Sequence, residues 1–190
     1  MENNKELKPN ESFKIINEMI ETAKMNIKQN AFYVLLWGWI VIIGCLLHFI
    51  FLKFSIIEKP YQVWLISIVG VVMTFIYSFK EAKRKKVFTH ISKIYIFIWV
   101  TFAVSYIITI VFHIQFNYQI YPLIFLFGGN SIFLTGIVMK FKPLIFGGIL
   151  FWIGCITSFY FTEAYNLLLT SIIGILGYLI PGYILKYKKD

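Results

Sequence analysis

The feature that most constrains this chain is a series of six long apolar stretches that contain no Asp, Glu, Lys or Arg. A helix of about 20 apolar residues rises about 30 Å, which is the thickness of the hydrocarbon core of a bilayer. Backbone amides in lipid must find their partners inside the segment, so such stretches fold as helices. The sequence therefore predicts an all-α membrane protein, a bundle of six transmembrane helices. The predicted spans are residues 31–52, 61–79, 94–112, 121–139, 143–161 and 165–185.

The composition agrees with a chain that is surrounded by lipid. Charged residues make up 14% of the 190 residues, against about 25% in soluble domains. The first 30 residues are polar, so we expect no cleavable signal peptide. Both cysteines, Cys45 and Cys155, fall inside predicted spans and match neither a disulfide framework nor a metal-binding motif. We expect no metal and no cofactor.

The distribution of Lys and Arg predicts the orientation. With six spans, sixteen of the 18 basic residues lie on one side of the membrane, and only Lys53 and Lys59 lie on the other. Cytoplasmic segments carry the excess of Lys and Arg, so both termini are predicted to be cytoplasmic. The net charge of +9 thus reflects topology, and no basic soluble face is expected to bind nucleic acid. The densest cluster, where anionic lipid headgroups are expected to bind, consists of Lys80, Lys83, Arg84, Lys85 and Lys86.

The segment before the first span is predicted to be a separate cytoplasmic unit, residues 1–30, followed by the transmembrane domain, residues 31–190. Residues 10–28 have the pattern of an amphipathic helix. Its apolar positions recur at spacings of three and four residues: Phe13, Ile16, Ile20, Ala23 and Ile27. Three placements are open: the helix lies on the inner membrane surface, packs beneath the bundle, or pairs with a protein partner.

Two further patterns concern the bundle itself. Residues 43–49 and 153–159 both contain Ile-Gly-Cys in corresponding positions of the first and fifth spans. This similarity indicates an arrangement of three helical hairpins related by an axis along the membrane normal. Pro181 is the one proline inside a predicted span, and it predicts a bend there because it cannot donate a hydrogen bond to the carbonyl of Gly177.

Few residues within the spans have the chemistry of a functional site. Asn130 follows Gly128 and Gly129 near the middle of the fourth span, and it is a candidate for either a solute site or a hydrogen bond between helices. His48 has the same two interpretations. No span contains a carboxylate, which argues against an ion-coupled pump. His113 and Glu163 are the only candidate groups for an enzyme that acts on lipids at the outer face.

One part of the chain carries a resemblance. The runs are Glu18-Met19-Ile20-Glu21-Thr22-Ala23-Lys24 and Leu35-Leu36-Trp37-Gly38-Trp39. Over about the first quarter of its length, the chain resembles a group of small uncharacterised multipass membrane proteins of Bacteroidota-type bacteria. The resemblance implies a location in the bacterial inner membrane. It implies no activity and no site residues.

These observations lead to two hypotheses. The leading one is a non-enzymatic membrane protein, an anchor or regulatory component, that acts through a protein partner bound by residues 10–28. The alternative is a small transporter or channel for a neutral or amphiphilic solute, with Asn130 at its centre. Under either hypothesis the chain can form a homo-oligomer.

Overall fold

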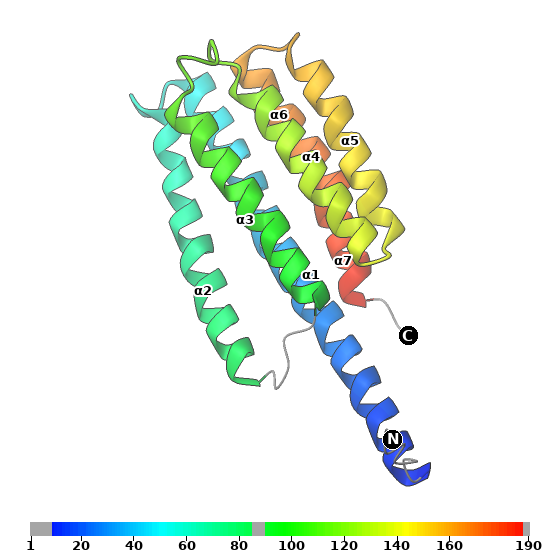
Figure 1. Ribbon diagram of the computed structural model, residues 1–190. Helices are drawn as coiled ribbons and strands as arrows, with labels where there is room; N and C mark the ends of the chain where they lie inside the picture. Colours follow the sequence, from blue (N-terminus) through cyan, green and yellow to red (C-terminus); the bar gives the residue numbers. More distant parts are fainter. Residues whose placement is uncertain (1–8, 85–89, 188–190) are drawn as a thin grey trace.

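The computed structural model describes residues 9–84 and 90–187, with side chains from Ala31 onward except at positions 81, 84 and 90–92. Every element in this part of the chain is helical, which confirms the all-α prediction. The helices run up and down in one bundle (Figure 1). In chain order they are α1 (Pro9–Phe54), η1 (Pro60–Leu65), α2 (Ile66–Arg84), α3 (His90–Val111), α4 (Ile120–Val138), α5 (Lys142–Ser158), α6 (Glu163–Gly174), η2 (Ile175–Leu179) and α7 (Ile180–Tyr187).

Five helical stretches of the described chain are long and apolar enough to cross a membrane, as expected of a multipass membrane protein. These stretches are Ala31–Phe54, Pro60–Lys80, Lys93–Val111, Ile120–Val138 and Glu163–Tyr187. The fifth predicted span, residues 143–161, is shorter than expected because α5 ends at Ser158 and contains only 17 residues. Helix α5 nevertheless runs beside α4 along the bundle and returns the chain to the start of α6 (Figure 1).

Helix α1 joins the predicted N-terminal helix to the first predicted span. It continues without a break for 46 residues, a length of about 69 Å. The reason is local, because the sequence contains neither Gly nor Pro between Asn10 and Trp37 to interrupt the backbone hydrogen bonds. Residues 9–30 extend past the end of the bundle (Figure 1). The amphipathic character of this extension stays a prediction, since its side chains lie outside the described ones.

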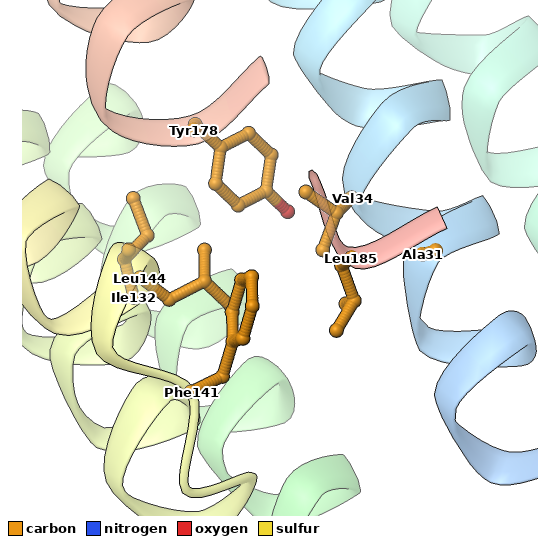
Figure 2. Packing of buried hydrophobic residues seen from close by; sticks show 7 residues of the cluster. All are labelled: Ala31, Val34, Ile132, Phe141, Leu144, Tyr178 and Leu185. Carbon is orange, nitrogen blue, oxygen red and sulfur yellow. The ribbon is translucent and has the colours of Figure 1, made fainter. Parts of the chain in front are cut away.

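The core of the bundle is formed by α1, α4, α5 and the continuous rod of α6, η2 and α7. Figure 2 shows side chains from these elements meeting in one cluster. Its buried members are Ala31, Val34, Ile132, Phe141, Leu144, Tyr178 and Leu185. This cluster lies toward one end of the bundle, which we call the terminal end. The extension of α1 and the last turn of α7 are found there. The opposite end, where α6 begins, is the distal end.

Helices α2 and α3 are peripheral. Only 6% of the apolar window in each is buried, against 44% in α4 and 50% in the last rod. Among the described residues, α2 packs on α1 and α3 packs on α4, but α2 and α3 make little contact with each other. Helices α2 and α3, although consecutive in the chain, are therefore not packed along each other.

Glycines bring α4 and α5 into close contact. A Cβ added to Gly136 would lie 2.7 Å from the backbone nitrogen of Ile145, and one added to Gly148 would lie 2.6 Å from the Cβ of Phe133. Neither position has room for a side chain. Small residues at such positions let two backbones approach closely in lipid, where packing rather than the hydrophobic effect drives helices together.

The distortion expected at Pro181 is a π-helical segment, η2, immediately before it. There the N–H of Ile180 donates to the carbonyl of Ile175, five residues earlier. Such a widened turn compensates for the hydrogen bond that a proline cannot make. The carbonyl of Gly177, which Pro181 leaves without its usual donor, lies against Gly147 of α5, and a Cβ at position 147 would collide with it.

Candidate functional site

His48 lies on α1 at the distal end and is only 5% exposed. The indole N–H of Trp64, in η1, donates to its Nδ1 at 3.3 Å. A ring nitrogen that accepts a hydrogen bond carries no proton, so this geometry assigns a neutral imidazole with its proton on Nε2. That nitrogen faces Glu163, with 3.9 Å between Nε2 and Oε1, which is too long for a hydrogen bond. Glu163 is thus near His48 without being bound by it.

A pocket of about 310 Å³ opens beside Glu163 at the distal end. Two connections build it, the one between α3 and α4 and the one between α5 and α6, together with the first turns of α4 and α6. Its lining residues are Asn117, Tyr118, Gln119, Ile120, Tyr121, Pro122, Phe159, Phe161, Glu163 and Asn166. The lining is therefore aromatic with a few polar groups, which is the usual composition of a small-molecule site.

Asn166 contributes the most deeply buried polar group of this lining, at 4% exposed. Its Nδ2 donates to the carbonyls of Ser158, at 3.1 Å, and Phe161, at 3.0 Å. These two bonds hold the connection between α5 and α6 in place. Its Oδ1 is buried and has no hydrogen-bond partner. An unsatisfied buried acceptor costs about 1–3 kcal/mol, so a donor that reached this oxygen would remove that cost.

The other wall of the pocket has an unusual backbone. Asn117 and Tyr118 both adopt positive φ angles, 50° and 61°. Left-handed conformations are uncommon for non-glycine residues and costly for bulky ones, and they concentrate at ligand sites. The segment is held by a bond from the amide of Tyr118 to the carbonyl of His113, at 2.9 Å. The His113 ring also packs edge-on against Tyr118, with 5.6 Å between ring centroids.

Asn130 does not belong to this pocket. It is exposed on the outer surface of α4, and its Oδ1 accepts a hydrogen bond from the indole N–H of Trp152 on α5 at 2.9 Å. The structure therefore separates Asn130 from His48, the other polar candidate within the spans. Of the two interpretations of Asn130, its geometry agrees with the hydrogen bond between helices.

The basic cluster lies at the terminal end, where α2 finishes. Lys80 and Lys83 are exposed. Lys85, Lys86 and the side chain of Arg84 lie outside the described part of the structure. Because the helices alternate in direction, other described lysines meet at the same end (Figure 1). They are Lys93, Lys140, Lys142 and Lys186.

Sequence reasoning found Glu163 and His48 but missed Trp64 and Asn166. Asn166 carried a usable signal, because a residue three positions after Glu163 on a helix lies on the same face. No feature of the sequence pointed to Trp64, because its contact with His48 depends on how η1 folds back on α1. Cys45 is buried and Cys155 half-buried, both as free thiols. Among the side chains that the structure describes, no group of three or more His, Cys, Asp or Glu is placed to hold a metal ion.

The comparisons with known proteins leave the site to be interpreted on its geometry. No protein family, curated protein or solved structure matches this chain.

Proposed function

We propose that this protein is a non-enzymatic component of the bacterial cytoplasmic membrane that anchors or regulates a protein partner through the extension of α1. In this proposal the chain has six spans, with both termini in the cytoplasm. Helix α5, at 17 residues, has the lower limit of length for a spanning helix. It also lies between α4 and α6, which run in the same direction, so it has to return the chain across the membrane.

The orientation rests on charge. The described lysines of the terminal end face the cytoplasm in this proposal, whereas Lys53 and Lys59 face the other side. Exposed Lys80 and Lys83 would then lie beside the anionic headgroups of the inner leaflet. Each basic side chain near such a surface contributes about 1 kcal/mol of attraction.

The observation that carries the proposal is the continuity of α1. A helix that lies flat on the membrane, or one that folds beneath the bundle, needs a break where the span ends near residue 30. Instead, residues 9–30 continue the helix of the span for about 33 Å. This continuity supports the third placement, in which the extension pairs with a protein partner.

The sequence of the extension fits a helical partner. Its apolar residues alternate at spacings of three and four from Phe13 to Ile27, which is the narrow seam of a two-helix contact. An exposed seam of this kind costs free energy in water, so a protein that covers it is stabilised on binding. We therefore propose an amphipathic helix of a cytoplasmic protein as the partner.

A photo-reactive amino acid at position 20, on the seam, tests this proposal in living cells. The matched control is position 18, which lies on the opposite face of the same helix. We expect one defined protein adduct at position 20 that is absent at position 18. Lipid adducts alone, or equal labelling at both positions, would contradict the partner proposal. An adduct with a second copy of the chain would show instead that the extension is a dimer contact.

The transporter hypothesis receives less support from the geometry. It placed a solute at Asn130, and that side chain is exposed on the bundle surface and bonded to Trp152.

A further inference from the structure

We propose that the distal pocket is a binding site for a primary ammonium group. This inference is independent of the partner proposal, because it concerns the opposite end of the molecule and none of the residues of the α1 extension.

The charge of the pocket selects a cation. Glu163 carries the only carboxylate among the lining residues, and none of them is a Lys or Arg. The histidine beside this carboxylate, His48, is neutral in the observed hydrogen-bond geometry and lies 3.9 Å from it. The carboxylate of Glu163 is thus uncompensated by a cationic side chain of the lining. An anionic ligand would be repelled, and an uncharged apolar one would desolvate the carboxylate without replacing its interactions with water.

The hydrogen-bonding capacity of the pocket selects a cation that has N–H groups. The unpaired Oδ1 of Asn166 can only accept, and the carboxylate of Glu163, three residues earlier on the same helix, also accepts. An ammonium group has three N–H donors and therefore matches both acceptors at once. A trimethylammonium group has the same charge but no N–H, so it would leave Asn166 unsatisfied.

The aromatic lining completes the match. Four aromatic residues line the pocket: Tyr118, Tyr121, Phe159 and Phe161. Aromatic faces attract cations, most strongly where water is excluded. The strained backbone at Tyr118, which positions one of these rings, is then explained as part of a preformed site.

An ammonium group could come from two sources. The pocket is built by connections at the ends of the spans, which is the level of lipid headgroups, so the ethanolamine headgroup of a phospholipid could enter it from the membrane. A soluble primary amine could enter it from the water. The chemistry recognised is the same, and the experiment below separates the two.

Native mass spectrometry of the full-length protein in nanodiscs measures the site directly. The nanodiscs contain equal amounts of phosphatidylethanolamine, phosphatidylcholine and phosphatidylglycerol. We expect one phosphatidylethanolamine per chain to be retained after the bulk lipid is removed, in preference to phosphatidylcholine. Glu163→Gln and Asn166→Leu should each reduce this retention about tenfold, because each removes an acceptor for a charged donor.

Glu58→Gln is the matched control, since it neutralises an exposed carboxylate at the same end of the bundle but outside the pocket lining. A melting temperature of each variant shows whether it still folds. If nanodiscs without phosphatidylethanolamine retain added ethanolamine, and Glu163→Gln abolishes that retention, the ligand is a soluble amine. Equal retention of phosphatidylethanolamine and phosphatidylcholine, or equal effects of Glu163→Gln and Glu58→Gln in folded protein, would overturn the proposal. So would the absence of any retained amine in both experiments.

Discussion

Several buried hydroxyl side chains in this bundle find their partners within their own helix, although the buried hydroxyl of Thr135 has none. Thr109, Thr170 and Ser171 each donate to the backbone carbonyl four residues earlier. Such bonds satisfy the hydroxyl without any neighbouring helix, so these residues can be buried in lipid-like surroundings at little cost. Asn166 is different, because an amide has both donors and an acceptor. The Nδ2 of Asn166 holds the α5–α6 connection, while its Oδ1 has no partner. The unpaired oxygen makes Asn166 a candidate site residue, whereas the three hydroxyl side chains serve packing alone.

Gly147 provides a sharp test at the residue scale. We expect Gly147→Ala to destabilise the protein by about 1–3 kcal/mol, the usual cost of overpacking a core, because the new Cβ would collide with the carbonyl of Gly177. Gly174→Ala is the control. Its Cβ would lie 3.5 Å from Ile42, an ordinary contact, and the change should be neutral or stabilising by up to about 1 kcal/mol. Thermal unfolding in detergent, followed by size exclusion, measures both. Equal melting temperatures would show that η2 and α5 can move apart.

At the scale of elements, the pair α4–α5 has the most extensive contact in the described bundle. Glycines on both helices let their backbones approach closely, and the ring of Phe133 packs on that of Trp152 with 4.8 Å between centroids. The bond between Trp152 and Asn130 adds a polar link on the exposed side of the pair. A hydrogen bond that faces lipid has no competing water, yet such links in membrane proteins contribute only about 0.6 kcal/mol on average, because the separated helices find other partners.

A double-mutant cycle tests the hydrogen bond between Trp152 and Asn130. We expect Asn130→Ala and Trp152→Phe to be coupled by about 0.5–1.5 kcal/mol, because either substitution removes the same hydrogen bond. The free energy of unfolding of the four proteins, measured in mixed micelles with denaturant, gives the coupling. Additive effects would show that the bond contributes nothing to stability. A loss of binding or transport with unchanged stability would instead return Asn130 to the solute hypothesis.

At the scale of the whole molecule, the core of α1, α4, α5 and the α6–η2–α7 rod carries two peripheral helices, α2 and α3. Helix α2 is held to α1 by a hydrogen bond from Trp37 to Thr74, at 3.1 Å, and by one between Tyr33 and Ser78, at 2.9 Å. Its remaining surface is apolar and exposed, as is most of α3. In a membrane these surfaces face lipid or another subunit. The long extension of α1 leaves the bundle at the terminal end (Figure 1).

The topology can be tested by thiol labelling. After Cys45 and Cys155 are replaced by Ala, Tyr160→Cys and Lys83→Cys each place one thiol at opposite ends of the bundle. Both positions are exposed, Tyr160 at 84%. We expect a membrane-impermeant reagent to label Tyr160→Cys in intact spheroplasts and Lys83→Cys only after permeabilisation, because the basic end faces the cytoplasm. Labelling of both in intact spheroplasts would contradict the alternation of spans, and the reverse pattern would invert the orientation.

Several features of the fold could be predicted from the sequence because they depend on one-dimensional properties. The all-helical class and most of the span limits follow from the length of apolar runs, and α4 (Ile120–Val138) lies within one residue of its predicted limits at both ends. The continuity of α1 was also readable, in the absence of Gly and Pro from residues 11–37. Pro181 predicted a distortion, although the widened turn lies just before the proline, at residues 175–179, rather than at it.

The contacts between helices depended on the tertiary structure. Three residues that are distant in the sequence lie together at the distal end: His48, Trp64 and Glu163. Trp64 follows His48 by 16 residues, and Glu163 follows Trp64 by 99 residues. The outward position of Asn130 and the separation of α2 from α3 were likewise decided by packing. The physical reason is the solvent. In water, apolar residues mark the buried face of a helix, but in a membrane the faces toward lipid and toward protein are both apolar, so the sequence determines that these helices span and the packing determines which of them meet.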